Sequence, residues 1–398
     1  MFRSVFEKSC DSRSGRGGFS ALVRKMWHSR PRLCHASGRM RSFRRLHSRG
    51  RLCHITIRIF HKFSGTAPTF QTPSKASLAA GSIVLVAFLC AAASADDLRI
   101  GMIGLDTSHV SVFAKLLNDA GDPQHVPGGK VVAAFKGGSK DIESSYSRVE
   151  GYTRELQDKY GVKIYESIEE MCKNVDAVML ESVDGRPHLE QVRPVIKAGK
   201  PVFIDKPVAG SLHDAIEIFR LAKEAKVPCF SASSYRFYRS LTDLMKQDIG
   251  EVRSCISIGP CHLEPHHPDL FWYGVHPTEA LFTVMGAGCE TVARTATTDT
   301  DVVTGTWKDG RVGVLYGIRT SGTPHKVIVF GSKAVAEQES SGDYVPLVAE
   351  IMKFFRTGVA PVSPEETIDI FAFMEAADES KRLGGVPVKI SDVIAKAE

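Results

Sequence analysis

From Leu98 onward, short runs of apolar residues alternate with stretches in which apolar residues recur at helical spacing. Two of the runs, VDAVML at 175–180 and PVFI at 201–204, are apolar at nearly every position. Continuous apolar runs are typical of parallel strands whose two faces are both covered by helices. Repeated strand–helix–strand units of this kind predict a doubly wound, Rossmann-type parallel α/β sheet with right-handed crossovers.

The pattern also sets approximate limits for each element of this sheet. The expected strands are Leu98–Ile103, Lys130–Phe135, Val162–Tyr165, Val175–Glu181, Pro201–Asp205 and Pro228–Ser231. The expected helices are Ser108–Ala120, Glu150–Tyr160, Ser167–Cys172, Pro187–Ala198 and Ser211–Lys226, two of which begin at a serine cap. Ligands of such folds bind beyond the carboxyl ends of the strands, so the residues directly after each strand are the candidates for chemistry.

After about Ser233 the pattern changes to that of an α+β domain with an open, mainly antiparallel sheet. Apolar and polar residues alternate over Glu251–Ile258, as in a half-exposed strand. Four further antiparallel strands and four helices are expected: Glu290–Thr297, Val302–Lys308, Arg311–Ile318 and Lys326–Phe330, with helices near 237–247, Pro277–Met285, Tyr344–Arg356 and Pro364–Arg382. An open sheet with one uncovered face commonly takes a partner subunit, so a homo-oligomer is expected.

The first 95 residues have the composition of a targeting segment rather than of a folded domain. The uncharged apolar stretch from Leu78 ends in Ala93-Ser94-Ala95, the pattern of a cleaved secretory signal peptide at 78–95. A single membrane anchor is the alternative, but the strongly apolar part is short for a span. Residues 1–77 are basic and lack apolar periodicity, so they are expected to be disordered or to reflect a misplaced start codon. The protein is therefore expected to be exported, periplasmic or extracellular, with domains at 96–232 and 233–398 and no stable membrane span after cleavage.

Charge separates these two parts of the chain. Residues 1–77 carry 17 Lys/Arg and two acids, whereas the remainder carries 34 Lys/Arg and 43 acids. An acidic folded part argues against nucleic acid as a partner. Five cysteines follow the apolar stretch without any CxxC spacing, so neither a zinc ribbon nor a disulfide framework is expected: Cys172, Cys229, Cys255, Cys261 and Cys289. They are predicted to be buried small apolar residues.

The turn after the first strand is the candidate site for a dinucleotide diphosphate. Glycines in such a loop permit a tight turn and close approach of the backbone to phosphate. Only Gly104 occupies a fingerprint position, and Asp106 and His109 stand where the other two glycines belong. An acid beside a diphosphate is unfavourable unless it turns away, and capping of the helix is the alternative role for this turn. The candidate cofactor-binding residues here are Gly101, Gly104, Asp106, Thr107, Ser108 and His109.

Two lysines follow later strands of the same sheet. Lys136 ends the second strand, where NAD-binding proteins carry an acid for the ribose hydroxyls, so it could meet the 2′-phosphate of NADP or be a solvated surface lysine. Lys206 lies in Asp205-Lys206-Pro207 at the end of the fifth strand. It could donate a proton to a substrate hydroxyl with Asp205 fixing its position, or be a plain salt-bridged lysine.

The segment Cys261–Asp269 contains ligand types that suit zinc, including three histidines. Pro265 and Pro268 break any helical register, and no second cluster completes a tetrahedral site. No metal is therefore expected, and these residues are interpreted as a polar loop near the substrate.

Several of these segments together resemble the Gfo/Idh/MocA oxidoreductases. The apolar strand leads to Val183-Asp-Gly-Arg-Pro-His188, and Ala198-Gly-Lys-Pro-Val-Phe-Ile-Asp-Lys-Pro207 is similar to the Ala-Gly-Lys-x-Val-x-x-Glu-Lys-Pro segment of that family. Ser234-Tyr-Arg-Phe237 resembles its Arg-Phe element, and Trp272 to Glu279 stand where the family has Asp-x-Gly-x-His-x-x-Asp.

The resemblance implies roles for these positions. Lys206 would relay a proton, His276 would take the proton of the substrate hydroxyl, and Asp205 would assist the lysine. Val183, His188 and Lys206 would contact NAD or NADP. The residues implied near the substrate are Arg236, Trp272, Tyr273 and Glu279.

Two functions remain open from the sequence. The first is an exported NAD(P)-dependent oxidoreductase that transfers hydride to or from a sugar or polyol, with glycoside cleavage or epimerisation through bound NAD as a variant. The second is a non-catalytic carbohydrate-binding protein on a degenerate dehydrogenase scaffold. The incomplete glycine pattern favours the second, whereas Asp205-Lys206-Pro207 and His276 favour the first.

Overall fold

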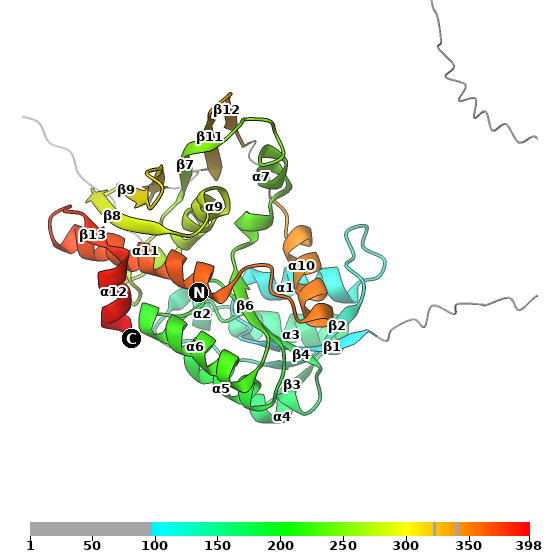
Figure 1. Ribbon diagram of the computed structural model, residues 1–398. Helices are drawn as coiled ribbons and strands as arrows, with labels where there is room; N and C mark the ends of the chain where they lie inside the picture. Colours follow the sequence, from blue (N-terminus) through cyan, green and yellow to red (C-terminus); the bar gives the residue numbers. More distant parts are fainter. Residues whose placement is uncertain (1–96, 321–323, 339–341) are drawn as a thin grey trace, which may run out of the picture. The chain divides into compact units, whose positions relative to one another are not determined.

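The computed structural model describes residues 97–320, 324–338 and 342–398, which form two sheets with their covering helices (Figure 1). The predicted signal peptide at 78–95 and the basic segment 1–77 lie outside the described residues. Among the described residues, no helix combines the length and apolarity that a membrane crossing needs.

The first sheet is parallel throughout, with the order β3-β2-β1-β4-β5-β6 of a Rossmann fold, as predicted. Its strands are β1 (Leu98–Ile103), β2 (Gly129–Phe135), β3 (Lys163–Tyr165), β4 (Ala177–Leu180), β5 (Val202–Asp205) and β6 (Cys229–Ala232). The helices between them are α1 (Ser108–Asn118), α2 (Glu143–Tyr146), α3 (Val149–Tyr160), α4 (Ile168–Cys172), α5 (His188–Lys197) and α6 (Leu212–Ala225).

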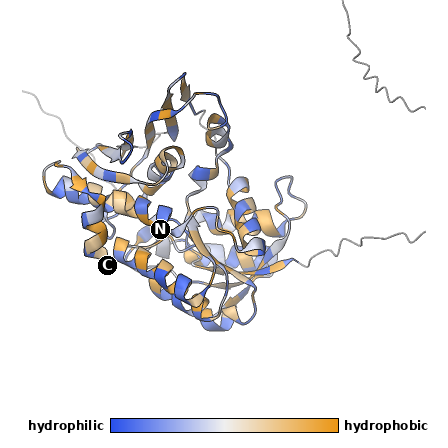
Figure 2. Cartoon of the chain, viewed as in Figure 1, coloured by the Kyte–Doolittle hydropathy of each residue, from blue (hydrophilic) through white to orange (hydrophobic). Residues whose placement is uncertain are grey.

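Local chemistry explains where these elements begin and what they bury. Every residue of β4 and β5 is buried, as expected for central parallel strands. The side chains of Ser167 and Ser211 accept hydrogen bonds from the amides of Glu170 and Asp214, which confirms both predicted serine caps. Hydrophobic and hydrophilic residues alternate along the covering helices (Figure 2), so each helix has an apolar side for the sheet and a polar side for solvent.

Helices cover both faces of the parallel sheet, and one of them comes from the far end of the chain. Helices α1 and α3 pack on one face, and α4, α5 and α6 pack on the other. Leu347, Val348 and Ile351 of α10 (Val345–Thr357) join the core under α1, where Figure 1 shows α10 beside α1. Helix α10 thus packs on the first domain, because its apolar side completes the core between α1 and the parallel sheet. The domain division near residue 233 stays a prediction.

The second sheet has seven strands in the order β12-β11-β7-β10-β9-β8-β13. They are β7 (Val252–Pro260), β8 (Cys289–Ala296), β9 (Thr300–Trp307), β10 (Val312–Ile318), β11 (Lys326–Gly331), β12 (Val335–Glu337) and β13 (Val388–Lys389). The other elements are the 3₁₀ helix η1 (Ser234–Phe237), α7 (Arg239–Leu244), α8 (Asp269–Trp272), α9 (Val275–Met285), α11 (Pro364–Arg382) and α12 (Ile390–Ala397). Buried and more exposed residues alternate along β9 and β10. The homo-oligomer that was expected to cover an open face of this sheet stays a prediction.

The sheet is mainly antiparallel, as predicted, although β7 pairs with β10 in parallel. The intervening α9 and the hairpin β8–β9 allow the chain to cross over before β10. The single helix expected near 237–247 is interrupted, because Tyr238 adopts an extended ψ of 129° between η1 and α7.

All five cysteines of the described part are buried and free, which confirms their prediction as small apolar residues. Burial raises the pKa of the Cys229 thiol to about 12, so it remains protonated and unreactive at neutral pH.

Candidate active site

The turn between β1 and α1 lies at the carboxyl edge of the parallel sheet and is shaped by one glycine. Gly104 has a φ of +83°, and a Cβ at this position would lie 2.1 Å from Ser182 Oγ. No other residue type fits here without moving the end of β4. Thr107 caps α1, and Ser108 is exposed at its first turn. The helix start is therefore accessible to an anion.

Asp106 is turned away from this helix start. Its carboxylate is fully buried and accepts hydrogen bonds from the Ser145 hydroxyl (2.6 Å) and from the Val183 amide (2.9 Å). Burial raises the pKa of Asp106, which favours the neutral acid. The electrostatic obstacle to a diphosphate is thereby reduced, so the residues of this turn fit a dinucleotide. Val183 serves this turn through its amide.

The other predicted cofactor-binding residues lie in different surroundings. Gly101 is buried within β1, where a Cβ would lie 3.0 Å from Met171, so it serves packing of α4 rather than the turn. Lys136 forms an ion pair with Glu150 (3.0 Å) on the surface, which accords with the solvated alternative. His188 is buried, with its ring nitrogens 2.9 Å from the Ser182 carbonyl oxygen and 3.2 Å from that of Val208. It therefore ties the loops after β4 and β5 together.

His109 and Asp205 form a contact that the sequence did not indicate. The Nδ1 atom of His109 lies 2.5 Å from Asp205 Oδ2, and both side chains are buried. The imidazole stacks on Phe113 and meets the edge of Tyr344. Asp205 was predicted to assist Lys206, but its carboxylate is directed to His109 from the first turn of α1. The pKa of Asp205 is lowered despite burial, because the charge and hydrogen bond of His109 stabilise the carboxylate.

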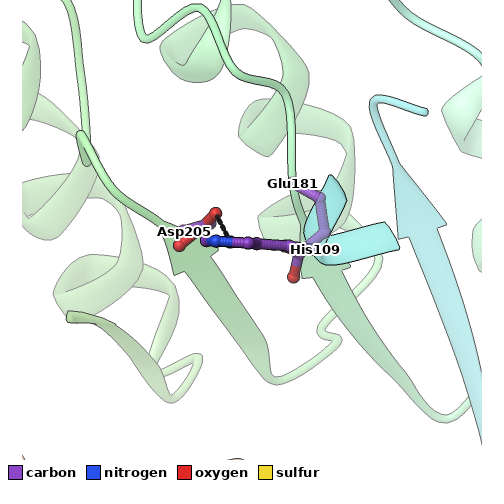
Figure 3. Close-up of side chains that lie close together, drawn as sticks. All are labelled: His109, Glu181 and Asp205. Atoms are coloured by element: carbon purple, nitrogen blue, oxygen red, sulfur yellow. Dashed lines mark hydrogen bonds and ion pairs between the residues drawn. The ribbon is translucent and has the colours of Figure 1, made fainter. Parts of the chain in front are cut away.

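Glu181, directly after β4, is a site residue that was missed. It is fully buried, and burial raises its pKa well above the usual range, with the charge of Asp205 acting in the same direction. Its place after a fully apolar strand was the available signal, because the ends of neighbouring parallel strands meet at one edge. Figure 3 shows Glu181, His109 and Asp205 converging there.

Lys206 and His276 come from different domains and meet at the same aromatic ring. Lys206 Nζ lies 5.6 Å from the ring centroid of Tyr273, and the ring of His276 lies 5.3 Å from it. Burial lowers the pKa of Lys206, while the charges of Asp205 and Glu181 oppose that shift. The two side chains therefore lie against one ring, while the crevice that they were predicted to share stays a prediction.

His276 is held in one orientation by a hydroxyl group. Its Nδ1 lies 2.6 Å from Ser233 Oγ, and its ring meets that of His325. The pKa of His276 is well below the usual value because of burial and the nearby charge of Lys206. The imidazole is neutral at neutral pH, and Ser233 leaves Nε2 as the nitrogen for chemistry. Sequence patterns gave no signal for the roles of Ser233 and His325.

Arg236 and Glu279 lie behind this group rather than at its surface. Glu279 accepts hydrogen bonds from Arg236 Nε (2.8 Å) and from the Ser233 amide (3.1 Å). Arg236 also pairs with Glu366 (2.7 Å). Both were predicted to lie near the substrate, but their charges compensate each other in the interior. Their observed effect is to hold the segment that carries Ser233.

The loop containing Cys261–Asp269 packs against the Rossmann domain. His267 Nε2 lies 3.1 Å from Asp184 Oδ1, and its ring meets Trp272 at 4.9 Å. Trp272, predicted to contact substrate, thus packs on this loop, whereas Tyr273 faces Lys206 and His276. His266 pairs with Glu264 (2.7 Å). His266 and His267 thus each have a carboxylate partner within the protein.

Known proteins are similar to this chain in sequence and in fold. A family model for oxidoreductases with an NAD-binding Rossmann fold matches residues 98–233. Myo-inositol 2-dehydrogenase of Thermotoga maritima is 29% identical over 213 residues, 45% of this chain and 62% of that protein. D-xylose 1-dehydrogenase (NADP⁺) 2 of Haloferax volcanii is 28% identical over 222 residues, 54% of this chain and 65% of that protein. The matches thus span less than two thirds of each relative.

Solved structures extend the likeness in fold to the second domain. Scyllo-inositol dehydrogenase from Lactobacillus casei, with bound NAD(H) and scyllo-inositol, superposes with a TM-score of 0.61 at 14% identity, covering 74% of this chain and 100% of that one. Myo-inositol 2-dehydrogenase from Lactobacillus plantarum gives 0.60 at 17% identity, covering 74% and 99%. At these identities the likeness establishes the two-domain fold.

Proposed function

We propose that this chain is a member of the Gfo/Idh/MocA oxidoreductases and acts as an NAD(P)-dependent oxidoreductase on a hydroxyl-bearing carbon of a sugar or polyol. The observation that carries the proposal is that Lys206 and His276, which come from different domains, both lie near the ring of Tyr273. The two matched relatives are named for myo-inositol and D-xylose, which supports this substrate class.

The cofactor would be held at the carboxyl edge of the Rossmann sheet. The backbone of the Gly104–Ser108 turn and the start of α1 would face the diphosphate, since Asp106 is directed elsewhere. Gly137 has a φ of +62°, and a Cβ at this position would lie 3.1 Å from Gly104 Cα, so the loop after β2 approaches the turn closely there. When bound, the nicotinamide supplies a hydride acceptor or donor for the substrate carbon.

The protein's own groups handle the substrate hydroxyl. His276 is neutral, and its Nδ1 is engaged by Ser233, so Nε2 is the atom that takes the hydroxyl proton during oxidation. Lys206 donates a hydrogen bond to the substrate oxygen and so orients it. Tyr273 contributes an apolar wall between these two side chains, a surface on which a sugar ring can pack.

Export is part of the same proposal. It is supported by the apolar stretch from Leu78 to Ala95 and its small-residue end, which precede the first strand. A mass measurement on protein recovered outside the cytoplasm tests it, and the expected amino terminus is Asp96. Glycoside cleavage or epimerisation through bound NAD is the finer variant of this proposal, since it uses the same proton-handling residues.

The direct test is to look for the cofactor. Freshly purified full-length protein is examined by ultraviolet absorbance and mass spectrometry for NAD(H) or NADP(H), and then titrated with each dinucleotide. We expect one of them to be retained or to bind. If neither dinucleotide is retained and neither binds up to millimolar concentration, the proposal of an oxidoreductase is rejected. Binding of a sugar by such a preparation would instead favour the non-catalytic carbohydrate-binding alternative.

The lowered pKa of His276 gives this activity a defined pH dependence. A histidine whose pKa is depressed stays neutral as the pH falls, and loses its function as a base only below that depressed value. We expect kcat/KM for oxidation to show no loss attributable to His276 between about pH 8 and about pH 6, although a histidine with the usual pKa of about 6.5 would titrate in this interval. The measurement is a pH profile of wild-type kcat/KM with a polyol substrate.

His276→Asn serves as the matched variant for this profile. It is expected to lower kcat by about 10²–10⁴-fold, the usual contribution of a positioned base. An acid limb with its midpoint at or above about pH 6.5 in the wild type, lost in His276→Asn, would contradict a depressed pKa.

A further inference from the structure

Glu181 and Asp205 leave buried carboxylate oxygens without hydrogen-bond partners in the described part of the chain. Both oxygens of Glu181 are unpaired, and so is Oδ1 of Asp205. The exposed fractions of the two residues are 0% and 2%. A buried carboxylate without compensation is costly, so such oxygens commonly face a cation that the protein binds.

His109 completes a set of three ligand atoms around this point. One atom from each of His109, Glu181 and Asp205 lies within 4.8 Å of the other two (Figure 3). Ligand distances of about 2.0–2.2 Å to a metal centre place such atoms roughly 3–4 Å apart. His109 Nδ1 and Asp205 Oδ2, now 2.5 Å apart, would separate slightly, and Glu181 would close on them. The His109 ring is fixed between Phe113 and Tyr344, and it starts from the capped first turn of α1.

We propose that His109, Glu181 and Asp205 bind one divalent transition-metal cation at the carboxyl edge of β4 and β5. One imidazole nitrogen with two carboxylate oxygens is a donor set that suits Zn²⁺, Mn²⁺ or Co²⁺, and three protein ligands leave further positions for water or substrate oxygen. The cation takes the place of the proton shared by His109 and Asp205, which is released on binding. Metal binding can be tested separately from the proposed oxidoreductase activity, because the three ligands are side chains of this chain and need neither dinucleotide nor substrate.

Charge accounts for the choice of a cation over an anion. The two carboxylates of the cluster are accompanied by Lys206, whose charge acts on both of them. Binding releases the proton that Glu181 retains at its raised pKa and the proton shared by His109 and Asp205, so two carboxylates and one ammonium then leave one net negative charge around the cation. A divalent cation reverses that sign and gives a partner to an oxygen of Glu181 that otherwise has none.

The test uses the full-length chain, stripped with a chelator and titrated with Co²⁺ or Zn²⁺ alone. We expect one equivalent of the ion to bind. Calorimetry measures the binding, and for Co²⁺ the visible absorption of the bound ion measures it as well. Glu181→Gln keeps the shape but removes the charge, and it should weaken binding by more than about 100-fold, beyond the cost of disturbing a merely supporting partner. Wild-type protein that takes up no Co²⁺ or Zn²⁺ at millimolar concentration overturns the proposal.

Glu264→Gln is the matched control, because Glu264 pairs with His266 in a second group of acids and histidine at the surface. It should leave the stoichiometry and affinity unchanged. Binding lost in Glu264→Gln but retained in Glu181→Gln would place the cation at the surface and refute the buried site.

Folding is checked separately from binding. Without metal, Glu181→Gln should unfold at a temperature close to that of the wild type, because the amide has the shape of the neutral acid that the raised pKa of Glu181 favours. His109→Gln should abolish the visible Co²⁺ spectrum. A folded His109→Gln protein with the wild-type Co²⁺ spectrum would exclude the imidazole as a ligand and overturn the proposed set.

Discussion

Replacement of Lys206 by methionine is expected to lower kcat by about 10²–10⁴-fold, the usual range for losing a positioned group in proton transfer. Methionine has a similar length and no charge, and Lys206 already lies partly buried beside Tyr273, so the fold is expected to remain intact. The loss follows because the substrate oxygen no longer has its hydrogen-bond donor next to His276. Steady-state kinetics with NAD(P) and a polyol give the measurement.

The control for this variant is Lys197→Met, at the exposed end of α5. It should have wild-type kcat and KM, because its side chain is remote from the ring shared by Lys206 and His276. A Lys206→Met protein that is folded and retains the wild-type kcat would remove Lys206 from the reaction. A change confined to KM would assign it to binding alone.

The largest expected effect on stability comes from Arg294. Its side chain is fully buried and binds Asp301 (2.8 Å from Nε), Asp269 (2.9 Å from Nη2) and Asp378. Arg294→Met should lower the free energy of unfolding by about 3–5 kcal/mol, because removing one partner leaves buried carboxylates uncompensated. The pKa of Asp378 is already raised to about 7 by burial, even with Arg294 beside it.

Urea denaturation of the wild type and Arg294→Met measures this effect. Arg382→Met is the control, since Arg382 pairs with Glu379 at the surface of α11 and should leave the free energy of unfolding close to that of the wild type. A loss below about 1 kcal/mol in Arg294→Met would show that the acids around it are neutralised in another way.

The parallel sheet follows from the sequence because its signals are local. Apolar runs such as 175–180 can only be covered on both faces, and serines at 167 and 211 mark helix starts by their own hydrogen bonds. The convergence of Lys206 and His276 was also predictable, since a resemblance in two segments carries information about the whole family fold. Asp106 was expected to turn away only to cap the helix, but Thr107 is the cap, and the partner of Asp106 is the distant Ser145.

Contacts between segments far apart in the chain were beyond this kind of prediction. The pairing of His109 with Asp205 joins residues 96 positions apart, and nothing in either segment indicates the other. The same holds for α10, whose apolar side suits any core but is buried in the first domain. Local propensity and periodicity therefore account for which helices and strands form. The identity of each buried charge's partner depends on how the strands' ends are brought together, because the cost of an unpaired charge is settled only by the neighbours that packing supplies.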